Sequence, residues 1–254
     1  MRTSHLALLT VLSAWLFTAC SSLEPEQGEL PVGSDVHIDN GLSNQRISSI
    51  AEDADGFIWI GTQRGLNRYD GDEMHQYFCN DQPNSIPDNR INAVFCDSKG
   101  RVWVTSKNGV ARYTDRDDFE YILAEGSDIN SLQMVETSRG DLYVKQNTEI
   151  LKYNPERNCF ESVISEVSFI DSFLQDFYVD EEDNLWVVDD RHVSCYNTVN
   201  FKLRCKFSLG EGVNPQASEL IGRKLWLSTI SGLRIYDVIA QQWDSLPEAI
   251  HSHT

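Results

Sequence analysis

The chain has 254 residues, of which 41% are hydrophobic and 24% are charged, and this balance predicts a globular protein with a sizeable core. Its formal net charge is −18. That charge argues against nucleic acid as a partner, since phosphate binding needs an excess of Lys and Arg, and against docking on an anionic membrane surface.

The N-terminal segment predicts export. Arg2 and His5 precede the apolar run "LALLTVLSAWLFTAC", which ends at Cys20. Fifteen residues are too few to span a bilayer, which needs about 20, so residues 1–20 are predicted to be a secretory signal. The end of the run, "FTACSS", resembles a bacterial lipoprotein signal, in which Cys20 is acylated and becomes the mature N-terminus. Ordinary cleavage and an uncleaved anchor are the alternatives.

An internal repeat begins after a polar segment, residues 21–34, which is predicted to be a flexible tether. The stretch "GFIWIGTQRGLNRYD" at residues 56–70 has the same internal distances as "GRVWVTSKNGVARYT" at residues 100–114. Its aromatic residue recurs five times, and a tyrosine follows each occurrence by ten residues. The pairs are Trp59 and Tyr69, Trp103 and Tyr113, Tyr143 and Tyr153, Trp186 and Tyr196, and Trp226 and Tyr236.

The period of the repeat predicts the fold class. Successive aromatic residues lie 44, 40, 43 and 40 residues apart, a period typical of a β-propeller with one four-stranded sheet per repeat. We therefore predict an all-β protein, a β-propeller of four-stranded antiparallel blades within residues 35–247. Five blades are visible, at about residues 40–80, 84–123, 127–164, 170–208 and 213–247, and a tail follows at 248–254.

The first repeat shows how a blade is expected to form. "RISSIAED", "FIWIGT", "LNRYD" and "MHQYF" are its four strands, separated by turn residues. The second strand is apolar on both faces, whereas a sheet with one wet face would alternate. We therefore expect the repeat aromatics to be core residues wedged between adjacent blades.

These residues carry a family resemblance. "NGLSNQRISSIAEDADGFIWIGTQRGLNRYD" resembles the two-component regulator propeller repeat, and the likeness extends over residues 36–247. The resemblance implies the periplasmic sensor region of a hybrid two-component system, which recognises oligosaccharides and controls genes for glycan use. In that family two propellers precede an immunoglobulin-like domain, a membrane span, a histidine kinase and a response regulator. These domains are the expected partners if the reading frame continues.

The resemblance also implies that the ring is incomplete. The family's propellers have seven blades, and five repeats leave about two missing. The segment "DVHID", residues 35–39, is predicted to be an outer strand just before the first repeat, although the fifth repeat already has its own outer strand near residues 241–246. The chain is then either a sensor fragment or a stand-alone lipoprotein, and a homodimer is compatible with both.

Strand direction locates a candidate binding site. Turns between the second and third strands share one face with the loops leading into the first strands, and basic residues gather there. The opposite face collects Asp53, Asp55, Asp70, Asp72, Glu181, Glu182 and Asp183. We predict an oligosaccharide site on the basic face, formed by some of Arg46, Arg64, Arg90, Lys107, Asn108, Glu149, Arg191 and His192.

Two of these residues break a pattern. Six residues after the aromatic, three repeats have a glycine, which favours a turn with positive φ, whereas the third and fourth have Glu149 and His192. Such departures are enriched at functional sites, and a different turn is the alternative explanation. The same two residues are the one acid–base pair available to a propeller lyase.

Other chemistry is sparse in the sequence. No HExxH, GxSxG or phosphate-binding loop is present, so no catalytic residues, metal or cofactor are predicted. Three function classes stay open: a ligand sensor without catalytic activity of its own, an envelope lipoprotein that binds protein or glycan, and a propeller lyase. The cysteines have no CxxC spacing and are interpreted as buried thiols, namely Cys79, Cys96, Cys159, Cys195 and Cys205.

Overall fold

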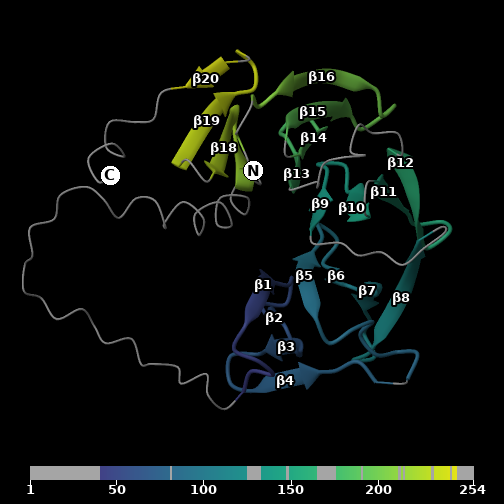
Figure 1. Ribbon diagram of the computed structural model, residues 1–254. Coiled ribbons are helices and arrows are strands. Elements are labelled where there is room, and N and C mark those ends of the chain that lie inside the picture. The colour runs from purple at the N-terminus through teal and green to yellow at the C-terminus, as the bar shows by residue number, and fades with distance from the viewer. Residues whose placement is uncertain are drawn as a thin grey trace, which may run out of the picture. The chain divides into compact units, whose positions relative to one another are not determined.

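A computed structural model of the protein describes residues 41–80, 82–124, 133–146, 149–164, 176–189, 191–210, 213, 215–229, 232–240 and 242–244 (Figure 1). The predicted signal with Cys20, the tether, the outer strand at 35–39 and the tail at 248–254 lie outside these residues. Every regular element described is a β-strand, and none of the described residues belongs to a helix long and apolar enough to cross a membrane.

Five four-stranded antiparallel sheets follow one another along the chain, which confirms the predicted fold class. Within each sheet, the strands pair in sequence order. The first blade contains β1 (Ile47–Glu52), β2 (Ile58–Thr62), β3 (Gly65–Tyr69) and β4 (Met74–Tyr77). The second contains β5 (Ile91–Cys96), β6 (Val102–Ser106), β7 (Gly109–Tyr113) and β8 (Phe119–Ala124).

The remaining three blades repeat this order. The third contains β9 (Met134–Glu136), β10 (Leu142–Gln146), β11 (Glu149–Asn154) and β12 (Cys159–Ile164). The fourth contains β13 (Asp176–Val179), β14 (Asn184–Val188), β15 (His192–Asn197) and β16 (Leu203–Ser208). The fifth contains β17 (Pro215–Ile221), β18 (Lys224–Thr229), β19 (Gly232–Asp237) and β20 (Gln242–Asp244).

One link between blades was not expected. The outer strands β8 and β12 run parallel and pair over two positions, Cys159 with Leu123 and Phe160 with Ala124. This pairing joins the second and third blades into one eight-stranded sheet. The other blades meet through side chains and individual hydrogen bonds, as in the contact of Ser49 Oγ with the backbone N–H of Val94 at 3.1 Å.

The repeat aromatics form the core between blades, as predicted. Trp59 of the first blade is fully buried and meets the ring of Tyr113, from the second blade, edge-on with 4.7 Å between centroids. Trp103 meets Tyr153 of the third blade in the same way, at 4.9 Å. In both pairs, the tyrosine ten residues after an aromatic packs on the aromatic of the preceding repeat. This explains why both must recur together.

The two ends of the array lack this cover. Ile50 in β1 is 61% exposed, whereas Val94, its equivalent one repeat later, is 6% exposed because the first blade covers it. Trp226 of the fifth blade is half-buried, unlike Trp59 and Trp103. The described blades are thus consistent with an open array.

Candidate ligand-binding edge

Each blade has two edges. The upper edge holds the turns between second and third strands together with the loops that lead into the first strands. Two backbone hydrogen bonds join these segments: Gln63 N–H donates to the Arg46 carbonyl at 3.0 Å, and Gly65 N–H donates to the Asn89 carbonyl at 2.6 Å. The prediction that these segments share one face is therefore confirmed for the first two blades. The lower edge holds the other two turns of each blade.

The predicted site residues all lie in upper-edge segments. Arg46 and Arg90 come immediately before β1 and β5, and Arg64 lies in the β2–β3 turn. The β6–β7 turn consists of Lys107 and Asn108. These five side chains are exposed, and so is Arg191 before β15, whereas Glu149 and His192, at the starts of β11 and β15, are half-buried.

Four cations of the upper edge have no counter-ion in the described part of the chain. Within the described residues, the side chains of Arg46, Arg64, Arg90 and Lys107 form neither an ion pair nor a hydrogen bond. Their backbone groups are nevertheless well fixed: Arg90 N–H, for example, donates to Asp88 Oδ1 at 2.8 Å. The structure therefore holds the backbone of this edge in place while leaving its positive charges free.

A recurrent hydroxyl closes the turns of this edge. Thr62 Oγ1 donates to the Gly65 carbonyl at 2.8 Å, and Ser106 Oγ donates to the Gly109 carbonyl at 3.0 Å. Gly65 and Gly109 have φ angles of 122° and 145°, which L-residues rarely adopt. The predicted positive φ at this turn position is confirmed, and Gly232 repeats it at 112°.

Glu149 and His192 depart from this pattern. Neither has a positive φ, and the hydroxyl three residues earlier is also replaced, by Gln146 and Asp189. Asp189 Oδ1 accepts hydrogen bonds from the backbone N–H groups of Arg191 at 2.7 Å and His192 at 2.6 Å. The His192 ring lies 3.6 Å from the same carboxylate, so the acid beside it is Asp189, not Glu149. In the fourth blade, the Asp189 carboxylate thus takes the place of the turn hydroxyl.

An exposed aromatic ring joins the upper edge. Phe78 directly follows β4, is 42% exposed, and lies so close to Gly65 that a Cβ there would approach its ring to 2.9 Å. Gly65, which directly follows Arg64, lies against this ring. Its N–H group donates to the carbonyl of Asn89, the residue before Arg90. Sequence analysis missed Phe78. The sequence signal that could have identified it is an aromatic residue just after the last strand of a blade, where core packing does not require one.

On the lower edge, by contrast, carboxylates serve the fold. Asp53 Oδ2 accepts a hydrogen bond from Trp59 Nε1 at 2.7 Å, and its Oδ1 caps the turn through the N–H groups of Asp55 and Phe57. Asp97 with Trp103 and Asp180 with Trp186 repeat the contact at 2.9 and 2.7 Å. An Asp six residues before each of these three tryptophans was the sequence signal.

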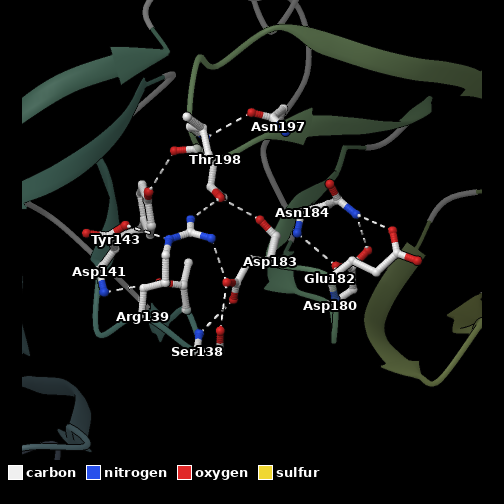
Figure 2. A network of polar contacts seen from close by, with 12 residues as sticks. Ser138, Arg139, Asp141, Tyr143, Asp180, Glu182, Asp183, Asn184, Asn197 and Thr198 are labelled. Carbon is white, nitrogen blue, oxygen red and sulfur yellow. Dashed lines mark hydrogen bonds and ion pairs between the residues drawn. The ribbon is translucent and has the colours of Figure 1, made fainter.

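Figure 2 shows a lower-edge network that joins the third and fourth blades. The carboxylate of Asp183 accepts hydrogen bonds from Ser138 N–H at 2.6 Å, Ser138 Oγ at 2.7 Å and Arg139 Nη1 at 2.7 Å. Arg139 Nη2 donates to Thr198 Oγ1 at 2.8 Å, and Thr198 in turn donates to the Asp183 carbonyl at 2.6 Å. Burial opposes ionisation of Asp183, but these donors and the Arg139 charge outweigh it, so its pKa lies below the usual value.

The first two blades are joined by a similar lower-edge cluster. Asp117 Oδ1 accepts hydrogen bonds from Tyr77 at 2.6 Å and Tyr113 at 2.7 Å, and Arg68 lies 3.3 Å away. Burial and the bond to Asp117 raise the pKa of Tyr77. Two lower-edge cations, Lys99 and Arg116, are exposed without an ion pair among the described residues. No group of three or more His, Cys, Asp or Glu suited to a metal ion occurs in the described part of the chain.

A family model matches the first half of each of the first two blades. The model of the two-component regulator propeller matches residues 41–64 and 85–108, so these two repeats are similar to that repeat. The matched segments contain five of the predicted site residues: Arg46, Arg64, Arg90, Lys107 and Asn108.

Solved structures share the fold at low sequence identity. The extracellular domain of BT4673 from B. thetaiotaomicron, named as a hybrid two-component system, aligns over 79% of this chain and 36% of its own length, with 17% identity and a TM-score of 0.48. This chain thus spans about a third of that protein domain. Virginiamycin B lyase from Staphylococcus aureus aligns over 78% of this chain and 72% of its own length, with 17% identity and a TM-score of 0.58. YCF48 bound to D1 peptide aligns over 80% of this chain and 67% of its own length, with 12% identity and a TM-score of 0.60. A search of curated proteins found no sequence match.

Proposed function

We propose that the chain is a ligand-sensing propeller of a hybrid two-component signalling system, that it lies on the outer side of the cytoplasmic membrane, and that its upper edge recognises an oligosaccharide. Two repeats of the regulator propeller type support the signalling role. The observation that carries the ligand site is the set of four exposed cations on the upper edge, which have no counter-ion among the described residues of a chain whose net charge is −18.

The chemistry of this edge favours an acidic sugar. A guanidinium group binds a carboxylate through two parallel hydrogen bonds, which a neutral hydroxyl cannot reproduce. Arg64 and Arg90 lie in segments joined by the Gly65–Asn89 hydrogen bond, and Phe78 adds an apolar ring beside them. A uronic acid residue offers a carboxylate, hydroxyls and an apolar ring face, which suits this combination.

Calorimetry with the full chain tests the site. Uronic-acid oligosaccharides and neutral oligosaccharides of the same length would be titrated into wild-type protein and two double variants. Arg64→Ala with Arg90→Ala should weaken binding of the acidic series at least about tenfold, because the lost contacts are charge-assisted. Lys99→Ala with Arg116→Ala removes the same charge from the lower edge and should leave affinity within about twofold.

Two outcomes would contradict the proposal. Binding of acidic ligands to the Arg64 and Arg90 double variant as tightly as to wild type would place their site elsewhere. Equal losses in the two double variants would show that net charge alone attracts the ligand and that the upper edge recognises nothing specific.

Membrane attachment through Cys20 belongs to the same proposal. Acylation of this cysteine would hold the propeller at the membrane, and Cys20→Ser should release it to the soluble fraction. Retention of the variant in the membrane fraction would favour an uncleaved anchor. This experiment is independent of ligand binding, so either part of the proposal can fail alone.

A further inference from the structure

The fourth blade contains two cysteines that face each other across neighbouring strands. Cys195 in β15 pairs in register with Cys205 in β16, and paired residues of an antiparallel sheet project their side chains to the same face. Both are thiols in the structure. Cα atoms of such pairs lie about 4.5 or 5.5 Å apart depending on the hydrogen-bonding pattern, and disulfides span about 4.4 to 6.8 Å. The two cysteines therefore meet the backbone requirement for a disulfide without any change of fold.

In the second and third blades, the residues at the equivalent positions also face each other across the third and fourth strands. In the second blade Arg112 lies opposite Glu120, and the two form an ion pair. In the third blade Lys152 lies opposite Glu161, again with opposite charges. The cysteine pair occupies the place where the second and third blades have side chains of opposite charge.

We propose that Cys195 and Cys205 form a cross-strand disulfide that fastens the outer strand of the fourth blade. Two S–H bonds break and one S–S bond forms, with release of two protons. The two electrons pass to a disulfide oxidant, whose own S–S bond is reduced to two thiols. Such oxidants act in the compartment proposed for this chain.

The surroundings decide the order of events. Cys195 is 3% exposed, beneath Trp186 and residues of the fifth blade, whereas Cys205 is half-buried. The accessible Cys205 thus reacts first with the oxidant, and Cys195 then displaces the oxidant from the mixed disulfide. Burial raises the pKa of both thiols, that of Cys195 to about 12, so this exchange is slow in the folded chain and fast while β16 is undocked.

Mass spectrometry after refolding tests the linkage. The full chain would be unfolded with reductant, refolded in a glutathione redox buffer, alkylated in denaturant and digested. We expect one linked peptide pair, which contains Cys195 and Cys205, with Cys79, Cys96 and Cys159 alkylated as internal controls. Alkylation of Cys195 and Cys205 to the same extent as Cys79 would overturn the proposal.

Stability gives a second measurement that does not depend on peptide recovery. Reductant should lower the urea midpoint of wild-type protein, because opening the link restores freedom to the unfolded chain. The midpoint of Cys205→Ala should not respond to reductant, while Cys159→Ala should respond like wild type. Cys205 is the half-buried partner, so this variant removes the link with the smaller loss of core packing. A wild-type midpoint that ignores reductant would also overturn the proposal.

Discussion

The lower-edge carboxylates and the upper-edge cations differ in whether the fold uses their charge. On the lower edge, Asp53, Asp97 and Asp183 each accept several hydrogen bonds and fasten turns, indole rings or the next blade. On the upper edge, Arg64 and Lys107 are exposed and without counter-ions within the described residues. The difference teaches that an accumulation of charge does not identify a binding face. The informative property is whether the fold has already used the charge.

The largest effect on stability is expected from the loss of a lower-edge carboxylate. Asp97 is fully buried, and it accepts hydrogen bonds from the Lys99 and Arg101 N–H groups, Arg101 Nε and Trp103 Nε1. Asp97→Ala leaves these donors without a partner and should cost about 3 kcal/mol of unfolding free energy. Urea unfolding followed by tryptophan fluorescence measures it.

A carboxylate of the upper edge is the matched control. Asp88 accepts one hydrogen bond, from Arg90 N–H at 2.8 Å. Asp88→Ala should therefore cost no more than about 1 kcal/mol. Equal losses at Asp97 and Asp88 would end the distinction between the edges.

A smaller effect is expected from the cation that joins the third and fourth blades. Arg139→Ala removes the hydrogen bonds to Asp183 and Thr198, and should destabilise the chain by about 1 to 2 kcal/mol, since Arg139 is partly exposed. Thermal unfolding measures the loss. Arg64→Ala, which removes an arginine from the upper edge, is the comparison variant and should unfold like wild type.

Acid should weaken the lower edge selectively. Hydrogen bonds from Ala240 N–H and the Lys224 ammonium group lower the pKa of Asp237 to about 2, from an ordinary value of 3.8. Because the folded pKa is the lower one, the carboxylate stabilises the fold fully above pH 4 and loses this effect as pH falls towards 2. The urea midpoint should fall over this range, and Asp237→Asn should flatten the fall. An unchanged pH profile in that variant would contradict the assignment.

The smallest effect is expected for the upper-edge cations. Lys107→Ala should change the unfolding free energy by less than about 0.5 kcal/mol, because its side chain has no described polar partner. A loss above about 1 kcal/mol would show that Lys107 is a structural residue. It would then leave the set of candidate ligand contacts.

The repeat and its blades could be predicted from the sequence because they depend on local periodicity. Trp59 and Tyr69, ten residues apart, identify the second and third strands, and Gly65 predicts the positive φ of the turn between them. The partner of Trp59 could not be assigned in that way, because it is Tyr113 of the next repeat. A fixed spacing shows that two residues recur together, but not which copies meet.

Interpretation of the candidate site was less complete. Glu149 and His192 were singled out as departures from glycine, yet the accompanying changes at Gln146 and Asp189 went unnoticed. At His192, the Asp189 carboxylate accepts the backbone hydrogen bond that explains the change. Among the cysteines, Cys195 is buried as expected, but the other four are only half-buried. The position of Cys205 opposite Cys195 depends on strand register, which a bulge shifts by one residue beside this pair.

The sequence by itself determined the five repeats, the order of four strands within each, and the apolar residues that pack between blades, because these follow from side-chain spacing along a single strand or turn. Only the tertiary structure decided which charges are used by the fold. Whether Asp183 binds Arg139 of the preceding blade, or Arg64 has no partner among the described residues, depends on which distant residues are brought to within about 3 Å of each other. Spacing along the chain carries no such information.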